Sequence, residues 1–286
     1  MRFWQLILLG ALVACQSNKD PRDSNYPINT STYESGLAVG SITDQRLLEI
    51  SGLEYSLKNA HHLWTHNDSQ GQPSLYLIDT SGTLRMTVYL QGAENYDWED
   101  ITSDGEHLYI ADIGDNRAVR PSTKIYMLEE PLRMSEDSVV VKDWLEMTLS
   151  YSNGPRDAET LMYDYLSGKL VIVSKRDDSC MIYSFEFSAG DSINITPKGQ
   201  VDLRMFTAGD MDESGAVVLK NYNSMFYWSA SNEPFVERFV NGPDSRIPYT
   251  VEPQGEAVTF ASEGSLYTAS EFNEHAKQQL YLYRRK

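Results

Sequence analysis

Short apolar runs, separated by turns that contain glycine or aspartate, follow one another along most of the chain. Runs such as "HLYIAD" and "KLVIVS" have the length of β-strands, and short alternating runs are the rule. No stretch sustains an apolar period of 3.6 residues, so long helices are not predicted. The aromatic residues include 18 Tyr against 9 Phe, which favours half-exposed strands. The pattern therefore predicts an all-β protein.

One unit of sequence occurs five times. Each copy has an acidic residue, a short apolar strand, a turn with Gly or Asp, and two further apolar strands. The acids that mark the copies are Glu49, Glu99, Glu159, Asp210 and Glu256. They are 50, 60, 51 and 46 residues apart (99−49, 159−99, 210−159 and 256−210). A repeat of this length with four antiparallel strands is typical of a β-propeller blade.

The fourth strand of each blade is expected between successive copies. The candidates begin at Leu84, Ser138, Lys198 and Pro234. The fifth copy reaches Lys286 without a fourth strand, and residues 35–44 offer a matching one. We therefore predict a single β-propeller over residues 33–286, with five four-stranded blades and an N-terminal strand that closes the last blade. A six-bladed ring, with blades of about 40 residues, and an open two-sheet sandwich are the alternatives.

The recurring acids stand at the start of the innermost strand of each predicted blade, and innermost strands line the channel of a propeller. Glu49, Glu99, Glu159 and Glu256 are therefore expected to meet at one mouth of the channel. Asp210 is the weakest member, because the apolar register gives the equivalent position to Gly209. Neighbouring carboxylates raise one another's pKa, and a hard cation such as Ca²⁺, which takes about six to eight oxygen ligands, would relieve this. Acids that cap turns are the alternative.

The ends of the second strands differ between copies, and divergence within a repeat is where a binding site is expected. The residues there are His66, Asn67 and Asp68, then Asp112, Asp115 and Asn116, then Lys175 and Arg176, then Lys220 and Tyr222, and finally Glu271. We expect Asp112, Asp115 and Glu271 to join the recurring acids as metal ligands. The predicted ligand-binding residues are His66, Asp68, Arg176 and Tyr222. Lys175 and Lys220 would stabilise developing charge in a hydrolytic site. Salt bridges between blades are the alternative.

The N-terminus predicts export. Arg2 precedes the apolar run "FWQLILLGALVA", which is too short for a permanent membrane span and reads as a secretory signal. Its last residues, "LVAC", resemble the lipobox of bacterial lipoproteins, in which the cysteine is acylated and the chain is cut before it. The resemblance implies a signal over residues 1–15 and a lipid on Cys15. Gln16 in place of an inner-membrane retention Asp implies the outer membrane. An ordinary signal peptide is the alternative.

Composition limits the partners. Residues 16–32 are polar with two prolines, which predicts a flexible tether between the lipid and the propeller. The formal charge of −17 repels nucleic-acid backbones and favours cations. With Cys15 lipidated, Cys180 has no partner for an intramolecular disulfide.

The motifs "EISGL", "LWTHNDS", "DWEDI", "LYIADIGDN", "DAETL" and "GEAVTF" occur in this order. They resemble those of bacterial propeller proteins described as phytase-like or esterase-like, with kinship to the SdiA-regulated type. The resemblance covers residues 47–283 and implies calcium together with phosphoester or ester hydrolysis. We expect an envelope lipoprotein whose calcium-bearing propeller binds a small anionic ligand or an envelope protein at the channel mouth. The alternatives are a metal-dependent hydrolase of phosphate or carboxylic esters and a non-catalytic assembly module.

Overall fold

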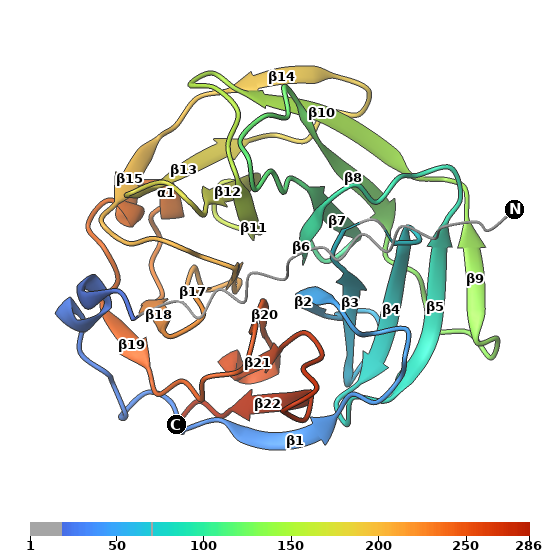
Figure 1. Ribbon diagram of the computed structural model, residues 1–286, viewed down its shortest axis with the longest axis horizontal. Coiled ribbons are helices and arrows are strands. Elements are labelled where there is room, and N and C mark those ends of the chain that lie inside the picture. Colours follow the sequence, from blue (N-terminus) through green and yellow to red (C-terminus); the bar gives the residue numbers. More distant parts are fainter. Residues whose placement is uncertain (1–18, 70) are drawn as a thin grey trace, which may run out of the picture.

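The computed structural model describes residues 19–69 and 71–286, and it shows five sheets around a common axis (Figure 1). The innermost strands of blades 1 to 5 are β2 (Ile50–Tyr55), β6 (Trp98–Ser103), β11 (Ala158–Asp164), β16 (Ala208–Met211) and β20 (Ala257–Phe260). Each packs against the innermost strand of the next blade, and β20 packs against β2, so the ring is closed. The predicted five-bladed β-propeller is confirmed.

The middle strands of the blades pair antiparallel in sequence order. The second strands are β3 (His62–Asn67), β7 (His107–Asp112), β12 (Lys169–Ser174), β17 (Val217–Lys220) and β21 (Leu266–Ala269). The third strands are β4 (Ser74–Asp79), β8 (Thr123–Glu129), β13 (Cys180–Phe185), β18 (Met225–Trp228) and β22 (Gln279–Tyr283).

The fourth strands form the rim of the ring. They are β5 (Leu84–Leu90), β10 (Leu145–Tyr151), β15 (Gly199–Val201), β19 (Ser245–Ile247) and β1 (Leu37–Ser41). β1 pairs antiparallel with β22, next to the C-terminus (Figure 1). The N-terminal strand therefore completes the last blade as predicted, and it covers an edge of β22 that would otherwise be unpaired.

Two of the expected fourth strands are different in the structure. The run from Ser138 contains two strands, of which β9 (Ser138–Val141) adds parallel to β5 of blade 1 and only β10 belongs to blade 2. β14 (Ser192–Ile195) likewise adds parallel to β10. The segment after Pro234 is a helix, α1 (Phe235–Phe239), because its two phenylalanines, one helical turn apart, both pack on Trp228. The short 3-10 helix η2 spans Ser262–Gly264.

The hydrophobic core consists of five clusters, one between each pair of neighbouring blades. The inner and middle strands are buried on both faces, because each blade packs against two neighbours. Large aromatic side chains such as Trp64, Trp98 and Trp228 are buried in these interfaces. Since every interface depends on both neighbours, the core is continuous only when the ring is closed.

The described part of the expected tether packs on the propeller. The 3-10 helix η1 (Pro21–Asn25) places Asp23, which is 3% exposed, against Asn221 of blade 4. Ile28 forms a bridge to Arg246, and Tyr33, 1% exposed, donates to Gly264 O at 2.9 Å. Buried polar and aromatic side chains thus fix residues 21–33, although their composition predicts a flexible linker. Cys15 and the signal lie outside the described residues, and no described helix has the length and apolarity needed to span a membrane.

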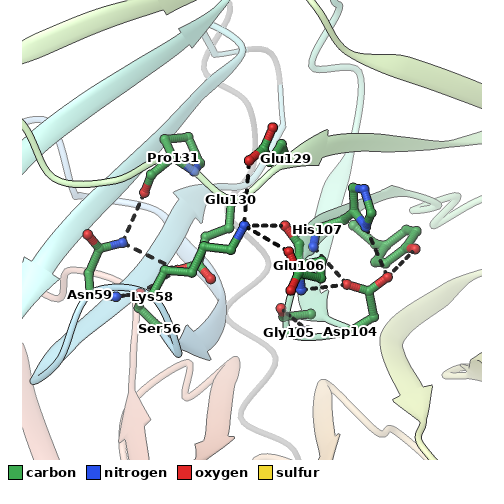
Figure 2. Close-up of polar contacts among 12 residues, drawn as sticks. Ser56, Lys58, Asn59, Asp104, Gly105, Glu106, His107, Glu129, Glu130 and Pro131 are labelled. Atoms are coloured by element: carbon green, nitrogen blue, oxygen red, sulfur yellow. Dashed lines mark hydrogen bonds and ion pairs between the residues drawn. The ribbon is translucent and has the colours of Figure 1, made fainter.

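Polar contacts join blades 1 and 2 at the end where the innermost strands finish (Figure 2). Glu130, 2% exposed, follows β8, and its Oε1 accepts from Ser56 Oγ and Trp64 Nε1. Lys58 Nζ donates to Glu106 O at 3.0 Å. The loop after β2 is therefore held by blade 2.

The contact between β1 and the turn before β5 generates a test of ring closure. A Cβ at Gly40 would overlap Ser81 O, and Ser41 N donates to the same oxygen at 3.2 Å. Gly40→Ala should displace β1 and lower the free energy of unfolding by about 1–3 kcal/mol. Gly71→Ala is the control, since the nearest atom to its Cβ is 3.9 Å away. Equal urea midpoints for the two variants would contradict the role of β1 in closing the ring.

Candidate functional site

Carboxylates line the channel mouth at which the innermost strands begin, and we call this region the acidic mouth. Its members are Asp68, Asp97, Glu99, Asp157, Glu159, Glu256 and Glu271. All five innermost strands start at this end of the ring, so the residues at their starts are forced together. Glu99, Asp157 and Glu159 are each only 4% exposed.

Two β-bulges aim acids into this mouth. The register between β6 and β7 shifts at Glu99, and that between β11 and β12 shifts at Glu159. The extra residue of a bulge turns its side chain away from the regular alternation. β2 has the same shift at Gly52, with φ of 80°, where a Cβ would lie 2.7 Å from His66 Nε2. Blade 1 therefore has Gly52, and not Glu49, at the equivalent position.

Asp68, Asp97 and Glu99 form a part of the mouth whose carboxylates have no direct ion pair. One carboxylate oxygen from each lies within 4.8 Å of the other two. Among the described residues, none of the three forms an ion pair, and Asp68 Oδ1 is buried without a hydrogen bond. Burial, reinforced by neighbouring carboxylates, raises the pKa of Asp68 to about 7 and that of Glu99 well above its usual range, although Lys175 opposes the rise for Glu99. Burial also raises the pKa of Asp97 to about 6, although Arg120 opposes this.

Glycine lets two of these carboxylates reach the backbone. Gly114 follows β7, and a Cβ there would overlap both Glu99 Oε1 and Asp97 Oδ2. Gly114 N donates to Asp97 O at 3.2 Å, which fixes the loop against the start of β6. The carboxylates of Asp97 and Glu99 therefore occupy space next to Gly114 that the side chain of any larger residue would take.

The opposite part of the mouth is compensated by Lys175, which is 2% exposed. Its Nζ pairs with Glu159 and donates to Tyr222 OH at 3.0 Å, and Tyr222 OH donates to Glu256. Burial acts to lower the pKa of Lys175, but the carboxylates of Glu159 and Glu256 outweigh it and raise this pKa well above its usual value. Burial and the Glu256 carboxylate raise the pKa of Glu271 to about 9.

Asp112 and Asp115 belong to a neighbouring network of arginine and aspartate. Arg120 Nη2 pairs with Asp112 Oδ1 at 2.7 Å, and Arg120 N donates to Asp115 Oδ2 at the same distance. Asp115 N in turn donates to Asp157 Oδ1 at 2.9 Å, and Asp157 Oδ2 pairs with Arg176 Nε at 2.6 Å. Both predicted ligands thus already have cationic or amide partners beside the mouth.

A cavity of about 260 Å³ opens next to this network. It is lined by Asp115, Asn116, Asp157 and Asp177 and by three arginines, Arg117, Arg156 and Arg176. Arg176 contacts Asn116 Oδ1, and Arg156 pairs with Asp177. The cavity therefore carries three guanidinium groups and three carboxylates, and Arg156 and Arg176 are each paired with an aspartate.

Two of the recurring acids, Glu49 and Asp210, are placed differently from the clustered acids of the mouth. Glu49 is exposed at the edge of the acidic mouth, where its carboxylate helps to raise the pKa of Asp68 and Glu271 and its backbone O accepts from Asp68 N at 2.8 Å. Asp210 lies near the other end of its strand and accepts from the backbone of Phe260 at 2.7 Å. It is therefore outside the mouth, as the Gly209 register suggested.

His66 and Lys220 are both fully buried. His66 packs edge-on against Trp98, and burial lowers its pKa to about 4, so the ring is neutral. Lys220 Nζ donates to Gly255 O beneath Glu256, and burial lowers its pKa to about 8. His66 and Lys220 are thus covered by the fold, as Lys175 nearly is, whereas the Arg176 side chain is partly exposed.

Sequence reasoning missed Asp97 and Asp157. Each stands two residues before a bulge glutamate, in "DWED" and "DAET". The repeated Asp-x-Glu pair was the available signal, because two residues along a strand return to the same face. Arg120 and Gly114 carried no comparable signal, since only the folded loop brings them to the acids.

Comparison with solved structures finds similar folds at low sequence identity. A gluconolactonase from Xanthomonas campestris has a TM-score of 0.47 and 12% identity, with 83% of this chain and 72% of that chain covered. A putative gluconolactonase has a TM-score of 0.47 and 13% identity, with 90% of this chain and 89% of that chain covered. The soluble aldose sugar dehydrogenase of Escherichia coli in its apo form has a TM-score of 0.50 and 10% identity, with 89% of this chain and 100% of that chain covered. At these identities the likeness concerns the propeller fold alone. No family model and no curated protein match the chain.

The buried carboxyl of Glu99 predicts a pH dependence of stability. The pKa of Glu99 in the folded protein is raised above the value of about 4.3 that it has in the unfolded chain. Ionisation of Glu99 therefore lowers the free energy of unfolding as pH rises through the folded-state pKa, and below about pH 4.3 this loss is small. In metal-free buffer Glu99→Gln should therefore be more stable than the native chain by about 1–3 kcal/mol near pH 8, with a smaller gain near pH 5. Urea unfolding at the two pH values measures this, and a destabilised Gln variant near pH 8 would show that the carboxylate has a structural partner.

Proposed function

We propose that the acidic mouth binds a divalent cation, with Ca²⁺ the best fit, and that the arginine-lined cavity beside it holds the anionic part of a ligand. One observation carries the proposal. Asp68, Asp97 and Glu99 bring three carboxylates together, and no cationic side chain among the described residues pairs with any of them. A buried cluster of this kind is stable only if it is protonated or neutralised by a cation.

The donor set favours a hard cation. All three groups offer carboxylate oxygens, which Ca²⁺ and Mg²⁺ prefer, and none offers sulfur or imidazole. Asp68 Oδ1, buried without a hydrogen bond, is available as a donor atom. Ca²⁺ accepts irregular oxygen geometry more readily than Mg²⁺ does, which suits acids that come from a loop and a bulge.

The ligand side of the proposal depends on charge placement. Asp157 and Arg176 connect the acidic mouth to the arginine-lined cavity, which is formed by Arg117, Arg156, Arg176 and their aspartate neighbours. A ligand with a carboxylate or phosphate group would contact the guanidinium groups there while another oxygen faced the cation. Lipidated Cys15 and location at the outer membrane belong to the same proposal, and the sequence pattern alone supports them.

A second candidate function is metal-dependent hydrolysis of a phosphate or carboxylic ester. The observation that favours it is the buried Lys175, whose ammonium lies between Glu159 and Tyr222 at the edge of the mouth. A bound cation would polarise an ester oxygen. Lys175 would then stabilise negative charge that develops near Tyr222.

Calcium binding is tested by thermal unfolding. A ligand that binds only the native state stabilises it by about 2.7 kcal/mol at a hundredfold excess over its Kd, so Ca²⁺ should raise the melting temperature after EDTA treatment. Asp97→Asn and Glu99→Gln should abolish the rise. Glu186→Gln, a similar change of charge at an exposed residue, is the control and should keep it. The absence of any shift at millimolar Ca²⁺ would end the cation proposal.

Ester hydrolysis is tested separately with phosphate and carboxylic ester substrates in Ca²⁺ and in EDTA. The hydrolase candidate predicts calcium-dependent turnover that falls by about 10²-fold or more in Lys175→Met, because a charge-stabilising donor is lost. Binding of inorganic phosphate that is weakened in Arg176→Gln, without turnover of any substrate, supports the binding function instead. Turnover that is unchanged in Lys175→Met would exclude the assigned role of this lysine.

A further inference from the structure

The end of the channel opposite the acidic mouth contains a cavity of about 290 Å³. It lies where the innermost strands β2, β16 and β20 end, and Tyr165, just after β11, also lines it. Its apolar walls include Tyr55, Leu57, Tyr165, Met211 and Phe260, and its acids are Glu54, Asp210, Asp212, Glu213 and Glu263. The described residues around it include no Lys, Arg or His. The cavity is therefore acidic and partly aromatic.

Glu54 is the distinctive residue of this cavity. It is 6% exposed, and within the described chain its carboxylate has no hydrogen bond and no ion pair. The charged groups that act on its carboxyl are the acids Asp210, Glu130 and Asp100, of which Glu130 lies in the contact between blades 1 and 2 (Figure 2). Burial, reinforced by these acids, raises the pKa of Glu54 well above its usual range. A buried carboxyl without a partner is rare and needs an explanation.

Two buried acids that act on Glu54, Asp210 and Asp100, are satisfied by the fold. Asp210 accepts from Met211 N and Phe260 N, both at 2.7 Å, and from Thr259 Oγ1 at 3.0 Å. Asp100 accepts from Ile101 N at 3.0 Å and Leu161 N at 2.9 Å. These two acids connect neighbouring blades through backbone amides. Glu54 makes no such link, so ring assembly does not explain it.

We infer that this cavity binds a small organic ammonium ion, with its charged group on Glu54 and its apolar part against the tyrosine and phenylalanine side chains. An ammonium group would supply the hydrogen-bond donors and the positive charge that Glu54 lacks. Aromatic walls favour cations further. A metal ion fits less well, because the clustered carboxylate groups found among the described residues lie at the acidic mouth and not here.

The experiment measures binding of butylamine by isothermal titration calorimetry, with butan-1-ol as the uncharged analogue of the same shape. Butylamine should bind at millimolar concentrations and butan-1-ol should not. Glu54→Gln should weaken butylamine binding by about tenfold or more, as expected for loss of one charged hydrogen bond. The substitution removes a buried carboxyl without a partner, so the melting temperature should not fall.

Two controls make the result specific to this cavity. Glu186→Gln removes the same charge from the surface and should keep butylamine affinity. Glu54→Gln should also keep the calcium response of the acidic mouth, so failure of one site is distinguishable from failure of the other. The inference is overturned if butylamine does not bind the native chain, if butan-1-ol binds equally well, or if Glu54→Gln binds butylamine with native affinity.

Discussion

The structure depends on one constraint, which is that five innermost strands begin at the same end of a closed ring. Closure requires β1 to pair with β22, because the fifth blade has no other fourth strand among the described residues. Once the ring is closed, bulges in β6 and β11 direct Glu99 and Glu159 toward each other, and burial prevents water from screening them. The charge at the acidic mouth is thus a consequence of topology, and the chain compensates only part of it.

Some buried acids of the channel have ion pairs or backbone amide donors and others do not. This difference distinguishes structural acids from acids of the candidate site. Lys175, Arg120 and Arg176 neutralise one side of the mouth, and backbone amides satisfy Asp100 and Asp210 deeper in the channel. In the described chain, Asp68, Asp97, Glu99 and Glu54 form no ion pair, although Arg120 and Lys175 lie close enough to act on Asp97 and Glu99. Buried charge without a partner costs several kcal/mol, so a fold retains it where something else supplies the missing partner.

The sequence predicted the fold better than the site, for a physical reason. Blade number and ring closure follow from strand spacing, because each strand must alternate and each blade must bury two faces. Sequence alone did not show that Phe235 and Phe239 form a helix on Trp228. Nor did it place the bulges, since a register shift is a property of two paired strands. For that reason Glu49 was expected at the position in blade 1 that Gly52 occupies. The strand register had already assigned the equivalent position in blade 4 to Gly209, and Asp210 indeed lies outside the mouth.

The two ends of the channel should act independently. The innermost strands contain four to seven residues, which at about 3.3 Å per residue separates the ends by roughly 13–23 Å. Consistent with this, the charged groups that perturb Glu54 are Asp210, Glu130 and Asp100, and no member of the acidic mouth is among them. The satisfied acids Asp100 and Asp210 lie between the ends, fixed by backbone amides, so occupancy of one end has no mobile charged group through which to reach the other.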